Sequence, residues 1–154
     1  FQFVQNDAVL TGFELSYEQT ISQWWEANAQ AEAVFSYNLD ENIPLPFTPP
    51  VAALAGLEHH FGWNPFLRKL TAGLQYEYVF AQNRVDRNER STPDYQLVHA
   101  QLQWEDFMGL KDFRVDFQIQ NLFNARYFRH LSRYRFLNLP EQGRNLVLRV
   151  QYDF

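Results

Sequence analysis

The chain has 154 residues, enough for one domain with a sizeable core, and its 18 acidic side chains outnumber its 13 basic ones. This balance leaves no basic stripe to neutralise the phosphates of a nucleic acid, so nucleic acid is not an expected partner. Without cysteine the chain forms no disulfide and no thiolate metal site, and no run reaches the roughly 18 apolar residues of a membrane helix. Aromatic residues nevertheless make up 18% of the chain, a high share for an ordinary soluble domain.

Seven segments alternate apolar and polar side chains, a period of two that predicts β-strands whose faces meet different surroundings. The second segment is rich in Ala, Glu and Gln, which also favour helix, but its neighbours are strands and we predict a strand there too. In chain order the predicted strands are residues 1–20, 24–38, 51–62, 69–85, 94–106, 112–123 and 144–154.

The connections between these segments alternate between short and long. The short ones lie near residues 21–23, 62–68 and 106–111, and the long ones are 40–50, 86–94 and 124–144. Antiparallel strands joined up and down would place all short turns at one rim and all long loops at the other.

Alternation alone does not tell which surroundings the faces meet, because soluble sandwiches and membrane barrels share it. Three features favour a membrane barrel: polar faces with few Lys, aromatic side chains near strand ends, and segments of about 10 residues or more. We therefore expect an all-β, antiparallel, up-and-down transmembrane β-barrel with its apolar face toward lipid. The residues expected to line the lumen are Glu14, Glu26, Gln75, Glu77, Gln101, Arg114, Asp116, Gln118 and Arg149.

Three stretches together resemble the C-terminal end of a TonB-dependent outer-membrane receptor of the Bacteroidetes type. They are NDAVLTGFEL (6–15), IQNLFNARY (119–127) and HLSRYRFLNLPEQGRNLVLRVQYDF (130–154). The resemblance implies that residues 1–154 form the last seven strands of a barrel of roughly 22. The family's plug domain, its TonB box and the earlier strands would then lie outside this sequence. An odd strand number agrees with this, because bacterial single-chain barrels have even numbers from eight upward.

The resemblance also implies a function and a set of partners. Such receptors lie in the outer membrane of Gram-negative bacteria, surrounded by lipid, and import a scarce nutrient with energy that TonB delivers through the plug. A ferric siderophore, haem or another metal chelate is the expected cargo, with a glycan as a further possibility. Tyr152 and Phe154 resemble the C-terminal signal that the barrel-assembly machinery reads. No cofactor is expected.

Six residues are candidates for ligand binding. One is His99, mid-strand on the polar face, for which the alternative is a hydrogen-bonded lumen histidine. The longest loop is basic and could bind an anionic ligand or lipopolysaccharide phosphates. The alternative is a loop that packs on its neighbours through Tyr127, Tyr134 and Phe136. The loop candidates are Arg126, Arg129, His130, Arg133 and Arg135.

We expect neither an enzyme nor a metal centre. Glu14 and Glu18 share one face as a catalytic carboxylate pair would, but such pairs recur on nearly every polar face, and no catalytic motif is present. His59 and His60 are adjacent, so on a strand they point to opposite faces. The alternative architecture is a small self-contained barrel, either an outer-membrane enzyme or a soluble ligand-binding calyx, in which apolar side chains would lie inside.

Overall fold

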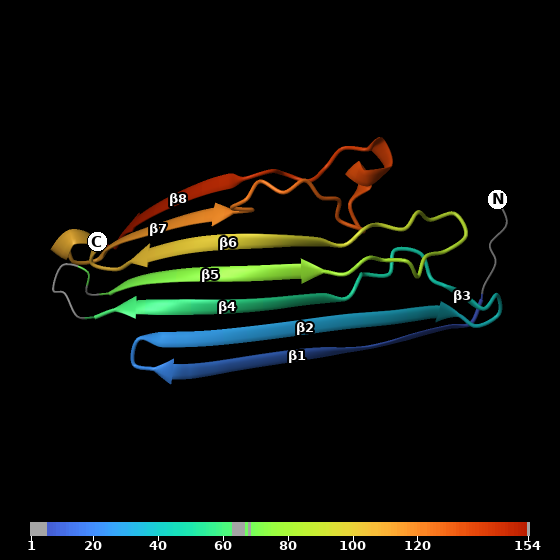
Figure 1. The fold of residues 1–154 in the computed structure, drawn as a ribbon, viewed down its shortest axis with the longest axis horizontal. Helices are drawn as coiled ribbons and strands as arrows, with labels where there is room; N and C mark the ends of the chain where they lie inside the picture. The colour runs from blue at the N-terminus through green and yellow to red at the C-terminus, as the bar shows by residue number, and fades with distance from the viewer. Residues whose placement is uncertain (1–5, 63–66, 68, 154) are drawn as a thin grey trace.

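The computed structural model describes residues 6–62, 67 and 69–153. They form one antiparallel sheet in the order β1-β2-β4-β5-β6-β7-β8, with β3 paired to β2 (Figure 1). The strands are β1 (Ala8–Ser22), β2 (Trp25–Asn38), β3 (Ile43–Pro44), β4 (Ala52–Phe61), β5 (Leu70–Val79), β6 (Tyr95–Trp104), β7 (Phe113–Gln120) and β8 (Asn145–Tyr152). Two short 3-10 helices are η1 (Phe107–Gly109) and η2 (Arg133–Leu137). Within the described residues, no helix has the length and apolarity needed to cross a membrane.

All seven predicted strands are present and joined up and down. The Ala-rich segment is a strand because both of its edges pair, with β1 on one side and β4 on the other. The strand predicted over 69–85 ends at Val79, because the chain then forms a loop held by a bridge between Gln82 and Thr92. The pattern does not predict β3, since two residues carry no periodicity. Residues 1–5 of the first predicted strand lie outside the described residues.

Short and long connections separate to opposite ends of the sheet, as the sequence predicts (Figure 1). The connections after β1 and β6 lie at one end, where β4 also ends and β5 begins. At the other end lie three longer segments, which we name loop A (39–51, containing β3), loop B (80–94) and loop C (121–144, containing η2). This arrangement places the three loops together above one rim of the sheet.

The register keeps the two faces chemically separate across the sheet. Directly opposed residues share a face. On one face, Phe117 of β7 lies between Leu102 of β6 and Leu148 of β8. On the other, Gln118 of β7 lies opposite Gln101 of β6, which in turn lies opposite Gly73 of β5. The alternation read in single strands therefore adds up to one apolar face and one polar face.

The apolar face is open rather than packed as a core. Leu148 is 66% exposed and Val150 is 55% exposed, although both lie in the middle of β8. A soluble calyx would enclose these side chains, so their exposure opposes that alternative and agrees with a surface that faces lipid. Other exposed members of this face are Phe13, Leu15, Tyr17, Leu57, Leu74, Tyr76, Leu102 and Leu146.

Buried side chains gather at the loop end of the sheet. The apolar ones are few, and more than half of the buried set is polar, which indicates that hydrogen bonds rather than an apolar core hold the loops. The buried apolar residues are Ala33, Val79, Leu97 and Tyr127, and the buried polar ones are Ser36, Thr48, Gln82, Thr92, Asn121 and His130.

Candidate functional site: the polar face and its loops

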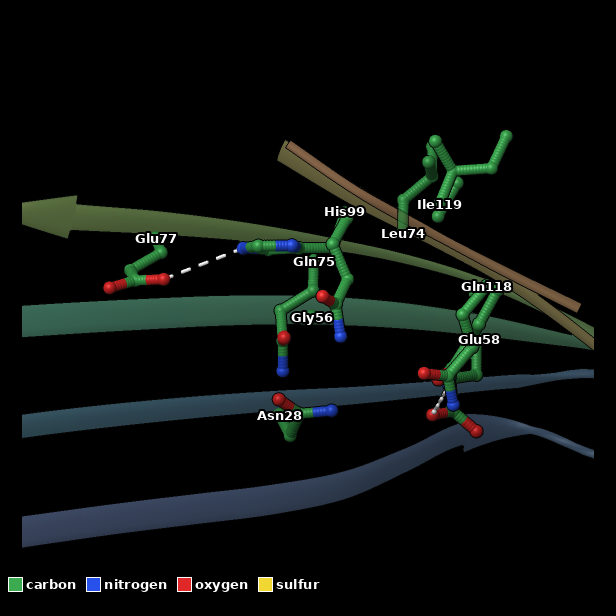
Figure 2. A pocket seen from close by; sticks show the side chains of 13 residues that line it. Asn28, Gly56, Glu58, Leu74, Gln75, Glu77, His99, Gln118 and Ile119 are labelled. Atoms are coloured by element: carbon green, nitrogen blue, oxygen red, sulfur yellow. Dashed lines mark hydrogen bonds and ion pairs between the residues drawn. The ribbon is translucent and has the colours of Figure 1, made fainter. Parts of the chain in front are cut away.

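A hollow of about 260 Å³ lies on the polar face, midway along the strands. Gly56 and Gly73 form part of its floor, and their missing side chains provide the space. A Cβ at Gly56 would come within 2.7 Å of the Asn28 amide, and one at Gly73 within 2.9 Å of the Gln101 side chain. Figure 2 shows polar side chains such as Gln75 on this side of the sheet. The sequence thus builds a groove lined by amides and carboxylates.

His99 lies in this groove and is engaged through both ring nitrogens. The backbone N–H of Asn121 donates to Nδ1 at 3.3 Å, and Nε2 lies 3.4 Å from Oε2 of Glu77 (Figure 2). Because Nδ1 accepts, the neutral ring carries its proton on Nε2 and directs it at the carboxylate. The expected hydrogen-bonded lumen histidine describes this arrangement, and His99 keeps 23% of its side chain exposed to the groove.

The remaining residues predicted to line the lumen all lie on the polar face. Gln101 donates to Oε1 of Glu58 at 2.9 Å, and Arg114 donates to Glu105 at 3.0 Å. Asp116 and Arg149 lie directly opposite each other on β7 and β8. The pairing of opposite charges across neighbouring strands balances charge on this face. The others are Glu14, opposite Glu32; Glu26, opposite Glu58; and Gln75 and Gln118, which line the mid-strand hollow.

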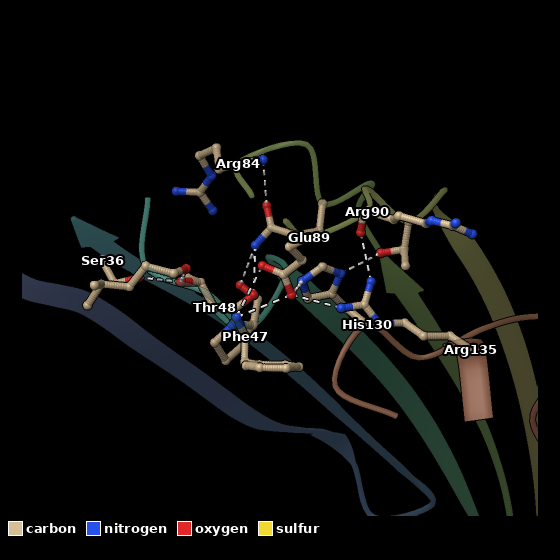
Figure 3. Close-up of polar contacts among 12 residues, drawn as sticks. Ser36, Phe47, Thr48, Arg84, Glu89, Arg90, His130 and Arg135 are labelled. Carbon is tan, nitrogen blue, oxygen red and sulfur yellow. Dashed lines mark hydrogen bonds and ion pairs between the residues drawn. The ribbon is translucent and has the colours of Figure 1, made fainter. Parts of the chain in front are cut away.

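At the loop end, Glu89 of loop B joins all three loops (Figure 3). Its Oε1 lies 2.8 Å from Nη2 of Arg135 and 3.1 Å from Nε2 of His130, both in loop C. Its carboxylate also accepts the backbone N–H of Phe47 in loop A at 3.2 Å. The side chains of Glu89 and Arg135 are each 5% exposed and that of His130 is fully buried. A buried charge must be paired and hydrogen-bonded, and these loops provide the partners.

A second set of buried hydrogen bonds supports the same junction. Gln82 of loop B donates through Nε2 to the carbonyl oxygens of Thr48 and Pro49 in loop A, at 2.9 and 3.0 Å. The Thr92 hydroxyl lies 3.0 Å from Nδ1 of His130. Loop B is therefore joined to loop A through main-chain carbonyl acceptors, and to loop C through the side chain of His130.

The basic candidates of loop C fall into two groups. His130 and Arg135 are buried in the Glu89 junction, whereas Arg126, Arg129 and Arg133 are exposed. Burial lowers the pKa of His130, the positive charge of Arg135 lowers it further, and Glu89 opposes both effects. The protonated form of His130 is therefore disfavoured in the folded protein.

Arg129 borders a second hollow, of about 320 Å³, between loop C and the polar face. Tyr95 and Glu77 also line it. Glu77 lines the mid-strand groove as well, so this carboxylate lies between the space under loop C and the groove. The polar face therefore offers a continuous row of charged and amide groups from the loops toward the middle of the strands.

Residues 1–122 match the sequence profile of a family described as TonB dependent receptor-like, beta-barrel. The chain belongs to the TonB-dependent receptor β-barrel family. The expected family and fold class are thereby confirmed. No curated protein sequence matches the chain.

Solved structures give the same fold for this TonB-dependent receptor segment. The structure titled "Copper transporter OprC" superposes with a TM-score of 0.85 at 21% identity, covering 97% of this chain and 24% of that one. The FrpB iron transporter of Neisseria meningitidis (F3-3 variant) gives 0.74 at 20% identity, covering 96% and 23%. The ferric yersiniabactin uptake receptor FyuA of Yersinia pestis gives 0.71 at 17% identity, covering 96% and 24%. The chain spans about a quarter of the length of these transporters.

The N-L-F-N stretch, one of those that resemble TonB-dependent receptors, forms side-chain hydrogen bonds to the backbone at the start of loop C. Asn121, at a φ of 51°, donates through Nδ2 to the carbonyl of Ala125 and accepts its N–H through Oδ1, both at 2.8 Å. Asn124 accepts the N–H of Arg144 at 2.9 Å. A Cβ at Gly143 would meet that same Asn124 oxygen at 2.6 Å. The N-L-F-N stretch therefore packs against the P-x-x-G-R-N stretch that leads into β8. The sequence alone does not show this contact, because the two stretches are about 20 residues apart.

Sequence reasoning missed Glu89, Gln82 and Thr48. Each is one polar residue in a polar loop, and its partners lie in other loops, so no spacing along the chain marks it. Of the assembly-signal candidates, Tyr152 ends β8 at the other end of the sheet, where it is 57% exposed and its ring lies 6.4 Å from that of Phe113. Phe154 lies outside the described residues.

Proposed function

We propose that this chain is the C-terminal part of the barrel of an outer-membrane receptor that imports an anionic metal chelate, such as a ferric siderophore or haem, with TonB-delivered energy. The observation that carries the proposal is the position of Glu77, which lines both the hollow under loop C and the mid-strand groove. In a closed barrel this row of polar groups faces the lumen. TonB would act through the plug, which lies outside this sequence.

The exposed arginines of loop C are the proposed first contacts for cargo. Arg126, Arg129 and Arg133 are exposed, and a guanidinium binds planar carboxylate groups through two parallel hydrogen bonds. Their positive charges also raise the rate of encounter with an anionic chelate. His130 and Arg135, by contrast, are engaged by Glu89, so their proposed contribution is to hold loop C in place above the lumen.

Transport then needs cargo to leave these first contacts. Below loop C the lining changes from guanidinium groups to amides and carboxylates, including Gln75, Glu77 and Gln101. An anionic chelate interacts less favourably with these groups, so the arrangement favours capture at the loops and weak binding in the wall. Proteins that conduct ligands need binding strong enough to admit them and weak enough to release them.

The test uses the full-length receptor in a strain without other iron receptors. Uptake of ⁵⁵Fe-labelled haemin, ferric citrate, a ferric catecholate and a ferric hydroxamate is measured with and without TonB. Uptake of a maltooligosaccharide is measured in parallel, as the uncharged alternative cargo. We expect TonB-dependent uptake of at least one chelate. The triple variant Arg126→Gln, Arg129→Gln, Arg133→Gln should reduce it at least tenfold.

Arg87→Gln is the matched control, because Arg87 is an exposed loop arginine paired with Glu41 of loop A. It should leave uptake within twofold of the parent. Uptake of the oligosaccharide alone, uptake that does not need TonB, or no chelate uptake by a receptor shown to be folded in the outer membrane would each overturn the proposal.

A further inference from the structure

Two carboxylates face each other near the short-turn end of the polar face. Glu26 of β2 and Glu58 of β4 are direct register partners, so their side chains project on the same side at adjacent positions. Like charges placed directly opposite are destabilising in a sheet. In the described part of the chain, the ion pairs of these two carboxylates involve no lysine or arginine; Glu26 pairs with His60 instead.

His60 brings an imidazole to the same place. It lies two residues after Glu58 on β4, and the period of two puts both side chains on the polar face. Its Nε2 is 3.7 Å from Oε1 of Glu26. One ligand atom from each of the three residues lies within 4.8 Å of the other two. The cluster therefore joins two carboxylate oxygens and one imidazole nitrogen.

Two of these groups also have a neighbour that sets their orientation. His60 Nδ1 lies 3.0 Å from the hydroxyl of Thr71, its register partner on β5, and Gln101 of β6 donates to Oε1 of Glu58. The Nε2 atom of His60 is buried and has no hydrogen-bond partner among the described residues, while 37% of the side chain as a whole is exposed. In the tautomer whose Nδ1–H donates to the Thr71 hydroxyl, Nε2 is unprotonated, which is the arrangement of a metal ligand with its supporting shell.

We propose that Glu26, Glu58 and His60 form a binding site for one divalent transition-metal ion, with Zn²⁺ as the reference ion and water completing its coordination. Two carboxylates and one imidazole match ligand sets that bind Zn²⁺ and Fe²⁺. Metal–ligand bonds of about 2.0–2.2 Å require the three atoms to approach by roughly 1 Å, which rotation of the two Glu side chains provides. The ion would offset the two facing negative charges.

This site borders the groove of the proposed cargo path through Glu58, but its other two ligands lie outside that groove. It lies at the short-turn end of the sheet, away from loops A, B and C, and the register brings its three ligands together from two neighbouring strands, β2 and β4. The sequence does not reveal it, because the adjacent His59 and His60 point to opposite faces of a strand, and the ring of His59 lies on the apolar face, 4.4 Å from that of Trp25. Glu26 comes next to Glu58 and His60 only through the pairing of β2 with β4.

The experiment measures Zn²⁺ binding by the full-length receptor, stripped with chelator and held in detergent, by titration in competition with a zinc indicator. The variants Glu26→Gln, Glu58→Gln and His60→Ala should each weaken binding at one site at least tenfold. Heat-dependent mobility on electrophoresis verifies that each variant is a folded barrel. Thr71→Val is a milder variant that keeps all three ligands and should weaken binding by a smaller factor.

Two matched controls test the geometry. Glu14→Gln alters another pair of directly opposed carboxylates, Glu14 and Glu32, and His59→Ala removes the adjacent histidine on the apolar face. Neither should change Zn²⁺ binding. Equal affinity in the parent and all three ligand variants, or equal losses in the controls, would overturn the site. Because the titration uses neither cargo nor TonB, its result is independent of the proposed import function.

Discussion

Oε1 of Glu89 lies 2.8 Å from Nη2 of Arg135, a residue 46 positions further along the chain. The same oxygen is 3.1 Å from His130, and the carboxylate accepts the N–H of Phe47. One acidic side chain therefore connects loops A, B and C. His130 and Arg135, two of the loop C residues expected from the sequence to bind ligand, pair with this carboxylate instead.

Replacing Glu89 should release the loops from one another. Glu89→Gln leaves Arg135 buried without its counter-charge, and removing one partner of a buried pair costs about 3–5 kcal/mol. Hydrogen exchange of the full receptor should show faster exchange across loops A and C. The control Glu41→Gln breaks an exposed pair with Arg87, worth about 0–1 kcal/mol. Equal exchange in the parent and Glu89→Gln would contradict the role of this carboxylate.

The junction should also loosen in acid. Burial, the largest effect, and the charge of Arg135 lower the pKa of His130, so the unfolded chain binds its proton more readily than the folded one. The stabilisation is complete above the unfolded pKa of about 6.5 and is lost as pH falls from that value through the lower pKa of the folded state. Spin labels on loops A and C should report wider separations at pH 5.5 than at pH 7.5. His130→Gln should flatten this response, and an unchanged response in the variant would show that another group titrates.

Asn121 should matter more than its position in a loop suggests. Asn121→Ala leaves the N–H and C=O of Ala125 without partners and places alanine at a φ of 51°. The expected loss is about 1–3 kcal/mol of unfolding free energy, measured by denaturant titration of the receptor in lipid vesicles. Asn145→Ala, which removes an exposed contact to Gln120, should change stability by less than about 0.5 kcal/mol.

The sequence predicts the strands well because each carries its own evidence. Leu146, Leu148 and Val150 alternate with polar residues within one short segment, so no partner needs to be known. The Ala-rich β2 shows the limit of this evidence: Ala27 and Ala31 suit a helix face as well as a strand face, and pairing with β1 and β4 decides between them. Loop B shows a second limit of this evidence. The strand pattern continues to residue 85, but β5 ends at Val79, and beyond it the described residues pair through the isolated bridge between Gln82 and Thr92.

The sites were harder to predict because they depend on contacts between strands and loops. His99 could be placed on the polar face from its position, but Glu77 becomes its partner only through the pairing of β5 with β6. The sequence marks His130 as a candidate but carries no sign of Glu89, whose carboxylate lies 3.1 Å from it. A register error of one residue would move Glu26 to the other face from Glu58.

The two faces should respond very differently to an added charge. Phe117→Arg places a guanidinium among Leu102 and Leu148 and should cost about 2–4 kcal/mol if the site lies near the bilayer midplane. Gln118→Arg places the same group on the polar face and should cost much less. Denaturant unfolding of both variants from the same lipid vesicles measures the difference, and equal costs would show that the faces are wrongly assigned.

The most direct measurement of this facing compares neighbouring positions on β8. Leu148→Cys and Arg149→Cys, each in a cysteine-free receptor in lipid, carry a spin label whose collisions with oxygen and with a water-soluble nickel chelate are measured. Oxygen concentrates in hydrocarbon, so the label at 148 should collide mainly with oxygen and the label at 149 mainly with nickel. The reverse order, or equal nickel access at both positions, would contradict a barrel wall with its apolar face toward lipid.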